Sequence, residues 1–255
     1  MSSDPLAHQD TLYRSSNPTR RRLHRQRRNL IIRLLRDCGP GRTADRPGLE
    51  VGPGSCTYLP TLLELCSQVT AADIEPAFLT RAQTIAEREP RLTATLDDLG
   101  RSALPAGHFS LILCSEVIEH IADSQPALTS LTRLLRPGGR LVLSTPQRWS
   151  AMEICARLAL APGVISLARL VYGESVEPTG HINLLTVTRL ERQFATAGLR
   201  IVHRELCGCY LPLVAEFGGR CGARWLARRE SWLARSRLSW LLWTQAYVLE
   251  RAADE

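Results

Sequence analysis

The sequence lacks lysine altogether, and all 32 of its basic residues are arginine. It also lacks any run of 18 apolar residues, so we expect no helix that crosses a membrane. Its eight cysteines form no Cys-x-x-Cys pair, and no secretory signal precedes them. Cys207 and Cys209 are too close together for an ordinary disulfide or a zinc knuckle. These absences predict buried, reduced thiols in a cytoplasmic protein rather than the disulfide framework of a secreted one.

The composition suits one globular domain with a sizeable core, because 44% of the 255 residues are hydrophobic. We expect this domain to cover residues 20–255. Residues 1–19 are polar and rich in serine, and they are predicted to be a disordered tail because they offer little surface to bury. The net charge of +7 is uneven, since arginine is in excess near both ends and acidic residues are in excess between them.

The first structured element predicted is a basic amphipathic helix over residues 20–38. Leu30, Ile31, Leu34 and Leu35 recur at helical spacing behind a run of arginines, and Gly39 follows. Three interpretations remain open for its basic face: an arm that binds RNA phosphates, a contact with an anionic membrane, or an ordinary solvated surface.

From Gly48 onward, apolar strand-like segments alternate with helical ones. Seven strands are predicted, in "GLEVG", "QVTAADI", "LTATLDD", "FSLILCSE", "RLVLST", "LRIVHREL" and "WTQAYVLERA". Helices are predicted between them at 58–65, 76–89, 126–135 and 188–197. This alternation predicts a Rossmann-like α/β fold, with a seven-stranded, mostly parallel sheet and helices on both faces.

Two segments interrupt the alternation. Residues 147–180 form an apolar insertion, which we expect to cover the site as a helical hairpin. Residues 211–240 are helical in pattern and carry arginine together with Trp225, Trp232 and Trp240, and Trp243 follows directly. Tryptophan among arginines is typical of an interfacial membrane anchor, although at helical spacing it also occurs in ordinary cores.

A glycine-bearing turn follows the first predicted strand. In "LEVGPGSCTY", Glu50, Gly52 and Gly54 mark the passage from strand to helix, where glycine lets the backbone approach a ligand. Asp73 ends the next strand, at the usual place for an acid that binds ribose hydroxyls. The pattern fits a dinucleotide or S-adenosylmethionine, but Thr57 stands where the dinucleotide fingerprint has its third glycine.

Between about residues 45 and 205 the chain resembles the class I S-adenosylmethionine-dependent methyltransferases. Four motifs carry the resemblance, "LEVGPGSCT", "AADIEPAFLTRAQ", "LPAGHFSLILCSEVIEHI" and "LLRPGGRLVLSTP". The resemblance implies that these residues contact or orient the cofactor: Glu50, Gly52, Gly54, Asp73, Asp98 (with Asp97 as a competitor), Leu99 and Ser115. The chain departs from the family pattern at Cys56, where many members have glycine, and at Ser110, where they usually have aspartate.

The stretch "EVIEH" places Glu116, Glu119 and His120 at spacings of three and four, which would gather them on one face if this stretch formed a helical turn. It resembles the metal-binding motif of small-RNA 2′-O-methyltransferases and a stretch of ubiquinone-pathway catechol O-methyltransferases. With His181 as a fourth ligand, the group would suit Mg²⁺, Mn²⁺ or Zn²⁺. Without a metal, Glu116, Glu119 and His120 would be catalytic through a base or orienting role, and His181 would cap the following helix.

The sequence thus predicts an enzyme that methylates an oxygen atom of a hydrophobic small molecule or of a lipid or quinone precursor. Its apolar insertion and tryptophans suggest peripheral contact with a membrane. The alternatives are RNA 2′-O-methylation with an arginine-rich arm, metal-free N- or C-methylation of a small molecule, and a binding module without catalysis.

Overall fold

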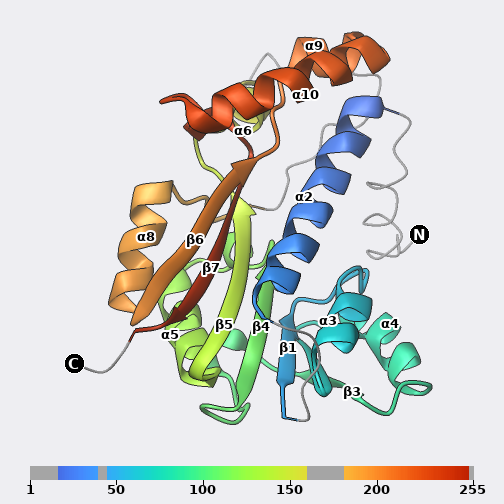
Figure 1. Cartoon of the computed structure of the whole chain (residues 1–255), viewed down its shortest axis with the longest axis vertical. Coiled ribbons are helices and arrows are strands. Elements are labelled where there is room, and N and C mark those ends of the chain that lie inside the picture. Colours follow the sequence, from blue (N-terminus) through green and yellow to red (C-terminus); the bar gives the residue numbers. More distant parts are fainter. Residues whose placement is uncertain (1–16, 40–44, 160–180, 253–255) are drawn as a thin grey trace.

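The computed structural model describes residues 17–39, 45–159 and 181–252, and its central feature is a seven-stranded sheet (Figure 1). The strand order is β3-β2-β1-β4-β5-β7-β6. The strands are β1 Pro47–Val51, β2 Gln68–Asp73, β3 Leu92–Leu96, β4 Phe109–Ser115, β5 Leu135–Pro146, β6 Leu199–Cys207 and β7 Thr244–Arg251. The pairs among the first five strands of this order are parallel, and only β7 runs against its neighbours β5 and β6. The predicted fold class is therefore confirmed.

Helices cover both faces of the sheet, because β4 is apolar on both. Leu111 and Leu113 point to a core that also contains side chains of α2 (Pro18–Asp37), α3 (Leu59–Leu65) and α4 (Pro76–Ala86). Ile112 and Cys114, which alternate with them, point to a second core shared with α5 (Ser124–Leu134) and α8 (Val187–Thr196). This double coverage makes the central strands rigid, so the residues at their carboxyl ends have fixed positions.

Helix α2 begins earlier than expected and is part of the core. Asn17 caps it by accepting hydrogen bonds from the backbone of Thr19 and Arg20, so the helix starts within the predicted tail. Residues 1–16 of that tail lie outside the described residues. Leu30, Ile31, Leu34 and Leu35 are buried against the sheet. The predicted amphipathic helix is therefore confirmed on its apolar side, and the three interpretations concern only its basic face.

A further layer lies beyond the carboxyl end of the sheet, at the top of Figure 1. It contains α6 (Ala151–Ala159), α9 (Pro212–Phe217), α10 (Gly219–Arg235) and the short 3₁₀ helix η3 (Ser239–Leu241). A third apolar cluster, including Leu23, Tyr210, Leu226 and Trp243, joins this layer to the start of α2. Of the predicted hairpin at 147–180, the structure describes residues 147–159, which include α6, and residues 160–180 lie outside the described residues.

The cysteines and the hydropathy of the helices bear on two expectations from the composition. Five of the eight cysteines are buried and none forms a disulfide, but Cys221 is exposed and Cys38 and Cys155 are only partly buried. The expectation of uniformly buried thiols is therefore wrong at these positions. No helix in the described part of the chain has both the length and the hydropathy needed to cross a membrane.

Candidate active site

A cavity of about 390 Å³ opens where β1 and β4 end, beneath α2 and α6. Its walls come from segments far apart in the chain, and they include most of the residues that the sequence singled out. They are His24, Arg27, Glu50, Gly52, Pro53, Gly54, Ser55, Thr57, Tyr58, Ser115, Glu116, Glu119, His120, Met152, His181 and Trp243. The carboxyl end of a parallel sheet is the usual ligand site of open α/β folds.

The glycine turn on one wall of the cavity requires glycine at Gly52. Its φ is +69°, and a Cβ atom there would lie only 2.6 Å from Cγ2 of Val117. Its N–H donates to the carbonyl of Ala72 on β2, which holds the turn close to the neighbouring strand. Gly54 also has a positive φ, of +45°. The turn therefore exposes bare backbone to the cavity, as a closely bound cofactor requires.

Glu50 is a buried carboxylate beside this turn. It is 2% exposed, and its Oε2 atom has no hydrogen-bond partner among the described residues. Burial raises the pKa of Glu50 well above its usual value. A positively charged ligand would supply the missing partner, and S-adenosylmethionine carries both a sulfonium and an ammonium group. The Gly52 turn and Glu50 therefore fit this cofactor.

Asp73 is the last residue of β2, and Asp98 and Leu99 follow β3, the next strand across the sheet; none of the three lines the cavity itself. Burial raises the pKa of Asp73, whose Oδ1 accepts from the N–H of Glu75. Asp98 caps a 3₁₀ turn at Leu99–Arg101, while the competing Asp97 accepts from the N–H of Ala103. Their order along the sheet edge suits an extended ligand that starts at Gly52.

The stretch "EVIEH" does not form the expected helical turn. Glu116 follows the end of β4 with a φ of +59°, and a 3₁₀ turn covers only Ile118–His120. Glu116 is held by Arg27, whose Nη1 lies 2.5 Å from Oε2, and by Ser144, whose Oγ donates at 3.0 Å. Ser144 also contacts Ser115 at 2.9 Å. Glu116 therefore belongs to a local chain of hydrogen bonds with Arg27 and Ser144. The prediction that Glu116, Glu119 and His120 share one helical face is wrong.

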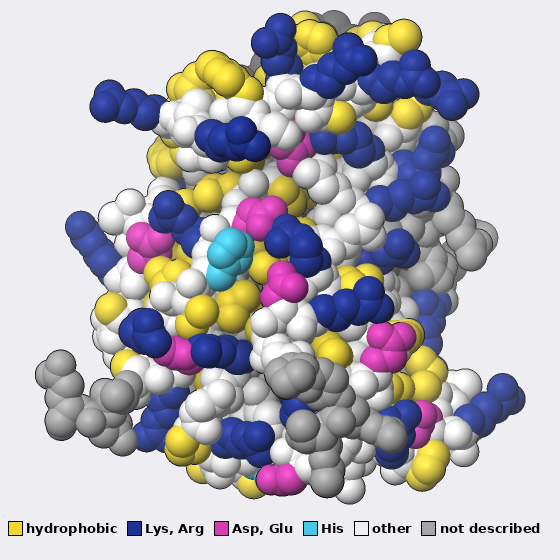
Figure 2. Space-filling model, in the orientation of Figure 1, with side chains coloured by type: hydrophobic (Ala, Val, Ile, Leu, Met, Phe, Trp, Pro, Cys, Tyr) yellow, Lys and Arg dark blue, Asp and Glu magenta, His cyan; other side chains and the backbone are white. Residues whose placement is uncertain are grey.

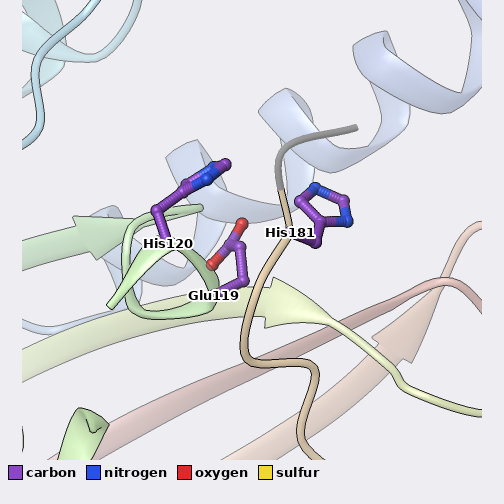
Figure 3. Close-up of side chains that lie close together, drawn as sticks. All are labelled: Glu119, His120 and His181. Atoms are coloured by element: carbon purple, nitrogen blue, oxygen red, sulfur yellow. The ribbon is translucent and has the colours of Figure 1, made fainter. Parts of the chain in front are cut away.

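Glu119, His120 and His181 do converge, although by another route. Their possible ligand atoms all lie within 4.8 Å of one another, and Figure 3 shows the Glu119 carboxylate between the two rings. The carbonyl of Glu119 accepts from the N–H groups of Ile182 and Asn183, which fixes the segment that carries His181. Thr186 caps the following helix α8, so the alternative of His181 as a helix cap is wrong. Glu116 lies outside this group, so three of the four predicted metal ligands come together.

The electrostatics of Glu119 favour a proton or a cation at this point. Its side chain is fully buried; Oε2 accepts from Thr145 at 2.9 Å, and Oε1 has no hydrogen-bond partner among the described residues. Burial, and next to it the charge of Glu116, raise the pKa of Glu119. A buried carboxylate with one free oxygen is stabilised by a bound divalent cation or by a nearby protonated group.

Several residues of the cavity could not be assigned to it from the sequence, because their positions depend on long-range packing. His24 and Arg27 come from α2, and Trp243 precedes β7. The guanidinium of Arg27 lies 5.2 Å from the ring centre of Trp243, and the His24 ring meets the same ring edge-on at 5.6 Å. The run of arginines in α2 and the tryptophans up to Trp243 were visible signals, but nothing local in the sequence distinguishes Arg27 from its neighbours. Trp243 is only 6% exposed, so its interpretation as part of an interfacial anchor is wrong.

Residues 23–204, which make up most of the chain, match the protein-family model described as a methyltransferase domain. The chain belongs to this family, the class I S-adenosylmethionine-dependent methyltransferases. The methyltransferase is 27% identical over 180 residues to a ubiquinone biosynthesis O-methyltransferase of Methylococcus capsulatus, covering 68% of this chain and 71% of the relative. It is 32% identical over 108 residues to a protein of the same description from Xanthomonas oryzae, covering 40% of this chain and 44% of the relative.

The solved structures agree on the fold. The N-methyltransferase NodS from Bradyrhizobium japonicum in complex with S-adenosylhomocysteine superposes with a TM-score of 0.59, at 18% identity, over 98% of this methyltransferase and 95% of NodS. A putative sarcosine dimethylglycine methyltransferase from Galdieria sulphuraria gives a TM-score of 0.60 over 91% and 88% of the two chains, at 13% identity. The alignment with the Xanthomonas relative spans less than half of that protein's length.

Proposed function

We propose that this methyltransferase transfers the methyl group of S-adenosylmethionine to a hydroxyl oxygen of a hydrophobic small molecule. The observation that carries the proposal is one cavity with two chemically different walls. One wall is the glycine turn with Glu50, and the other is the group formed by Glu119, His120 and His181. The cofactor wall suits the methyl donor, and the second wall carries the acid–base groups that a hydroxyl acceptor needs.

The proposed role of the cofactor wall is to bind the cofactor and to orient it. We propose that Gly52 and Gly54 admit the methionine part of the cofactor and that Glu50 balances its positive charge. Asp73 would hold the ribose, and Asp98 and Leu99 the adenine, with Ser115 closing the cavity next to the reacting carbon. When bound, the cofactor supplies an electrophilic methyl group on a sulfonium. The glycine turn and the strand ends hold it in line with the acceptor, which is the main requirement of a displacement reaction.

The proposed role of the acceptor wall is to receive the proton of the acceptor hydroxyl. Glu119 is buried and its Oε1 is free, and His120 and His181 flank it. We propose that these three residues lower the pKa of the acceptor hydroxyl by receiving its proton, directly or with a divalent cation that they ligate. A cation bound there would also hold two vicinal oxygens of the acceptor. Glu116, paired with Arg27, shapes this wall without joining the ligand set.

The lining of the cavity supports an aromatic, partly apolar acceptor. Trp243, Met152 and Tyr58 form apolar surface beside the polar group. The curated relatives are described as ubiquinone biosynthesis O-methyltransferases, which act in the formation of a quinone. We therefore propose an acceptor of the catechol or quinol class, such as a lipid-like quinone precursor.

The test uses tritiated S-adenosylmethionine with 4-tert-butylcatechol, its mono-hydroxyl analogue 4-tert-butylphenol and 4-tert-butylaniline. Methylation of the catechol alone supports the proposal, and preference for the aniline contradicts it. Glu119→Gln and His120→Ala should reduce kcat by about 10²–10⁴-fold while the Kd for S-adenosylhomocysteine changes little. Glu64→Gln, at an exposed position, is the matched control. Equal losses of turnover and of cofactor affinity would instead assign the group to the cofactor pocket.

The metal part of the proposal has its own measurement. Elemental analysis of the purified protein, together with turnover before and after a chelator, decides whether a cation acts with Glu119. A stoichiometric divalent metal that His181→Ala removes supports ligation. Full turnover in the chelated protein assigns the group to metal-free proton transfer.

One observation favours the RNA alternative. A groove of about 690 Å³ runs along α2, and Arg21, Arg22, Arg25 and Arg33 line it. Two of these arginines already pair with acids, Arg22 with Glu230 and Arg33 with Glu205, which reduces the charge available to phosphate. Tight, strongly salt-dependent binding of an RNA oligonucleotide, with methylation of its ribose, would move the acceptor to this class.

We also propose peripheral contact with an anionic membrane through α10 and η3. Trp232, Trp225 and Trp240 are 60%, 45% and 41% exposed in this region. Figure 2 shows arginine side chains interspersed with apolar ones over the top of the molecule, where α9 and α10 lie. Sedimentation with phosphatidylglycerol vesicles should capture the protein, and Trp225→Ala/Trp232→Ala should weaken capture. Equal capture by phosphatidylcholine vesicles, or no effect of the substitutions, would contradict this contact.

A further inference from the structure

Glu153 is a buried carboxylate that the reaction described so far does not use. It lies in the first turn of α6, and only 4% of its surface is exposed. In the sequence it is merely one of the few charges in an apolar insertion. Burying a carboxylate costs several kcal/mol unless partners compensate, so its contacts should explain why a charged residue stands there.

Its contacts lead directly to the acceptor wall. Oε1 of Glu153 lies 3.3 Å from Nδ1 of His181 and accepts from Nε1 of Trp243, also at 3.3 Å. Its own N–H donates to Oγ of Ser150, so the start of α6 is tied to the same point. Three segments far apart in the chain therefore meet at one carboxylate, and two of its neighbours, His181 and Trp243, line the cavity.

A carboxylate next to one ring nitrogen of histidine determines which nitrogen carries the proton. The proton is held on the nitrogen that faces the carboxylate, so the other nitrogen keeps its lone pair. The Glu153–His181 contact is at ion-pair distance without full hydrogen-bond alignment. Contacts of this kind commonly tighten only when the substrate is bound.

We propose that Glu153 is a positioning residue, which holds His181 as the Nδ1–H tautomer so that Nε2 is the basic atom offered to the acceptor. The proposal rests on the proposed function, since it assumes that His181 serves the acceptor. In the methyl transfer, the hydroxyl proton moves to Nε2 and the oxygen electron pair forms the new O–C bond. The electrons of the broken C–S bond remain on sulfur, and Glu153 stabilises the imidazolium. If His181 ligates a cation, the same tautomer leaves Nε2 as its ligand atom.

The first experiment reads the tautomer directly and requires no acceptor. Protein labelled with ¹⁵N-histidine is treated with a chelator, and its long-range ¹H–¹⁵N spectrum is recorded at about pH 8.5, where an unperturbed imidazole is neutral. The His181 signals are assigned by their loss in His181→Ala. The proposal expects Nδ1–H in the wild type and a shift toward Nε2–H in Glu153→Gln, whose amide has nearly the same shape.

Trp243→Phe is the matched control for packing. It removes the other donor to Glu153 but leaves the carboxylate in place, so the tautomer of His181 should be unchanged. An unchanged tautomer in Glu153→Gln overturns the proposal. So does a shift in Trp243→Phe as large as that in Glu153→Gln, because the cause would then be packing.

The second experiment measures turnover with 4-tert-butylcatechol. Glu153→Gln should lower kcat about 10- to 100-fold, the usual effect of removing the partner of a functional histidine, with little change in KM or in the Kd for S-adenosylhomocysteine. In a His181→Ala background, Glu153→Gln should have no further effect. Additive losses would make Glu153 purely structural and refute its role. If the wild type methylates none of the probes, the proposed function fails, while the tautomer measurement still decides the role of Glu153.

Discussion

The burial of His24 predicts how stability depends on pH. His24 is 8% exposed, and burial, with the nearby charges of Arg27 and Arg20, lowers its pKa from 6.5 to about 3. Between these values the unfolded chain binds a proton at His24 and the folded protein does not. Stability is therefore lost as the pH falls below 6.5, and the loss continues until the pH reaches the folded-state pKa.

The magnitude follows from the two pKa values. At pH 5, protonation of His24 stabilises the unfolded state by RT ln(1 + 10^1.5), where 1.5 is the difference between the unfolded pKa of 6.5 and the pH. The same term is small at pH 7. His24 therefore lowers the free energy of unfolding by about 2 kcal/mol between pH 7 and pH 5. Glu50 and Glu119, whose pKa values are raised, act in the opposite direction over this window because the folded protein binds their protons more readily. The comparison must therefore be made against a variant that differs only at His24.

The assay is urea unfolding of the wild type and of His24→Gln, followed by tryptophan fluorescence at pH 7 and pH 5. The stability of the wild type relative to the variant should fall by about 2 kcal/mol between the two pH values. A change below about 0.5 kcal/mol would refute the reasoning, because it would mean that folded His24 accepts a proton nearly as readily as a solvated histidine.

Three further predictions concern the glycine turn and the contacts of Glu230 in α10. Gly52→Ala should weaken S-adenosylhomocysteine binding at least about tenfold in calorimetry, whereas Gly107→Ala, at a similar φ but with open space around its Cβ, should leave it unchanged. Glu230→Ala should lower the free energy of unfolding, measured with a chemical denaturant, by about 3–5 kcal/mol, because Arg22 and the backbone N–H groups of Gly208 and Cys209 lose their acceptor. Glu64→Ala, at an exposed position, should change this free energy little. Cys56 has a φ of +58°, so Cys56→Val should be about 1–3 kcal/mol less stable than Cys56→Gly in thermal unfolding; equal stability would exclude strain at this position.

Much of the fold could be predicted from local patterns. The apolar residues of β4 and of its neighbours recur at strand spacing, and the turn at Gly52 needs glycine whatever surrounds it. The ends of the helices were predicted less accurately. Helix α4 ends at Ala86 rather than at residue 89, and α2 starts at Pro18 because Asn17 caps it. Such ends depend on individual capping hydrogen bonds, which composition does not reveal.

The acceptor wall could be predicted only in part. The motif "EVIEH" singled out Glu119 and His120, which lie together with His181 in the structure, but its spacing suggested a helical face that does not form. Glu116 turns through a left-handed conformation toward Arg27, a residue 89 positions earlier in the chain. No local rule predicts that partner, because its position depends on where α2 packs against the sheet.

By itself, then, the sequence determined the family, the order of strands and helices, and the glycine turn after β1, because these depend on short-range periodicity and on the backbone freedom of glycine. Only the tertiary structure decided which side chains share the cavity. It brought His181 to Glu119 through the backbone carbonyl of Glu119, and it brought Glu153 to His181 through the packing of α6. The physical reason is that such contacts join residues separated by tens of positions, and burial in a common core, rather than local preference, fixes their distance.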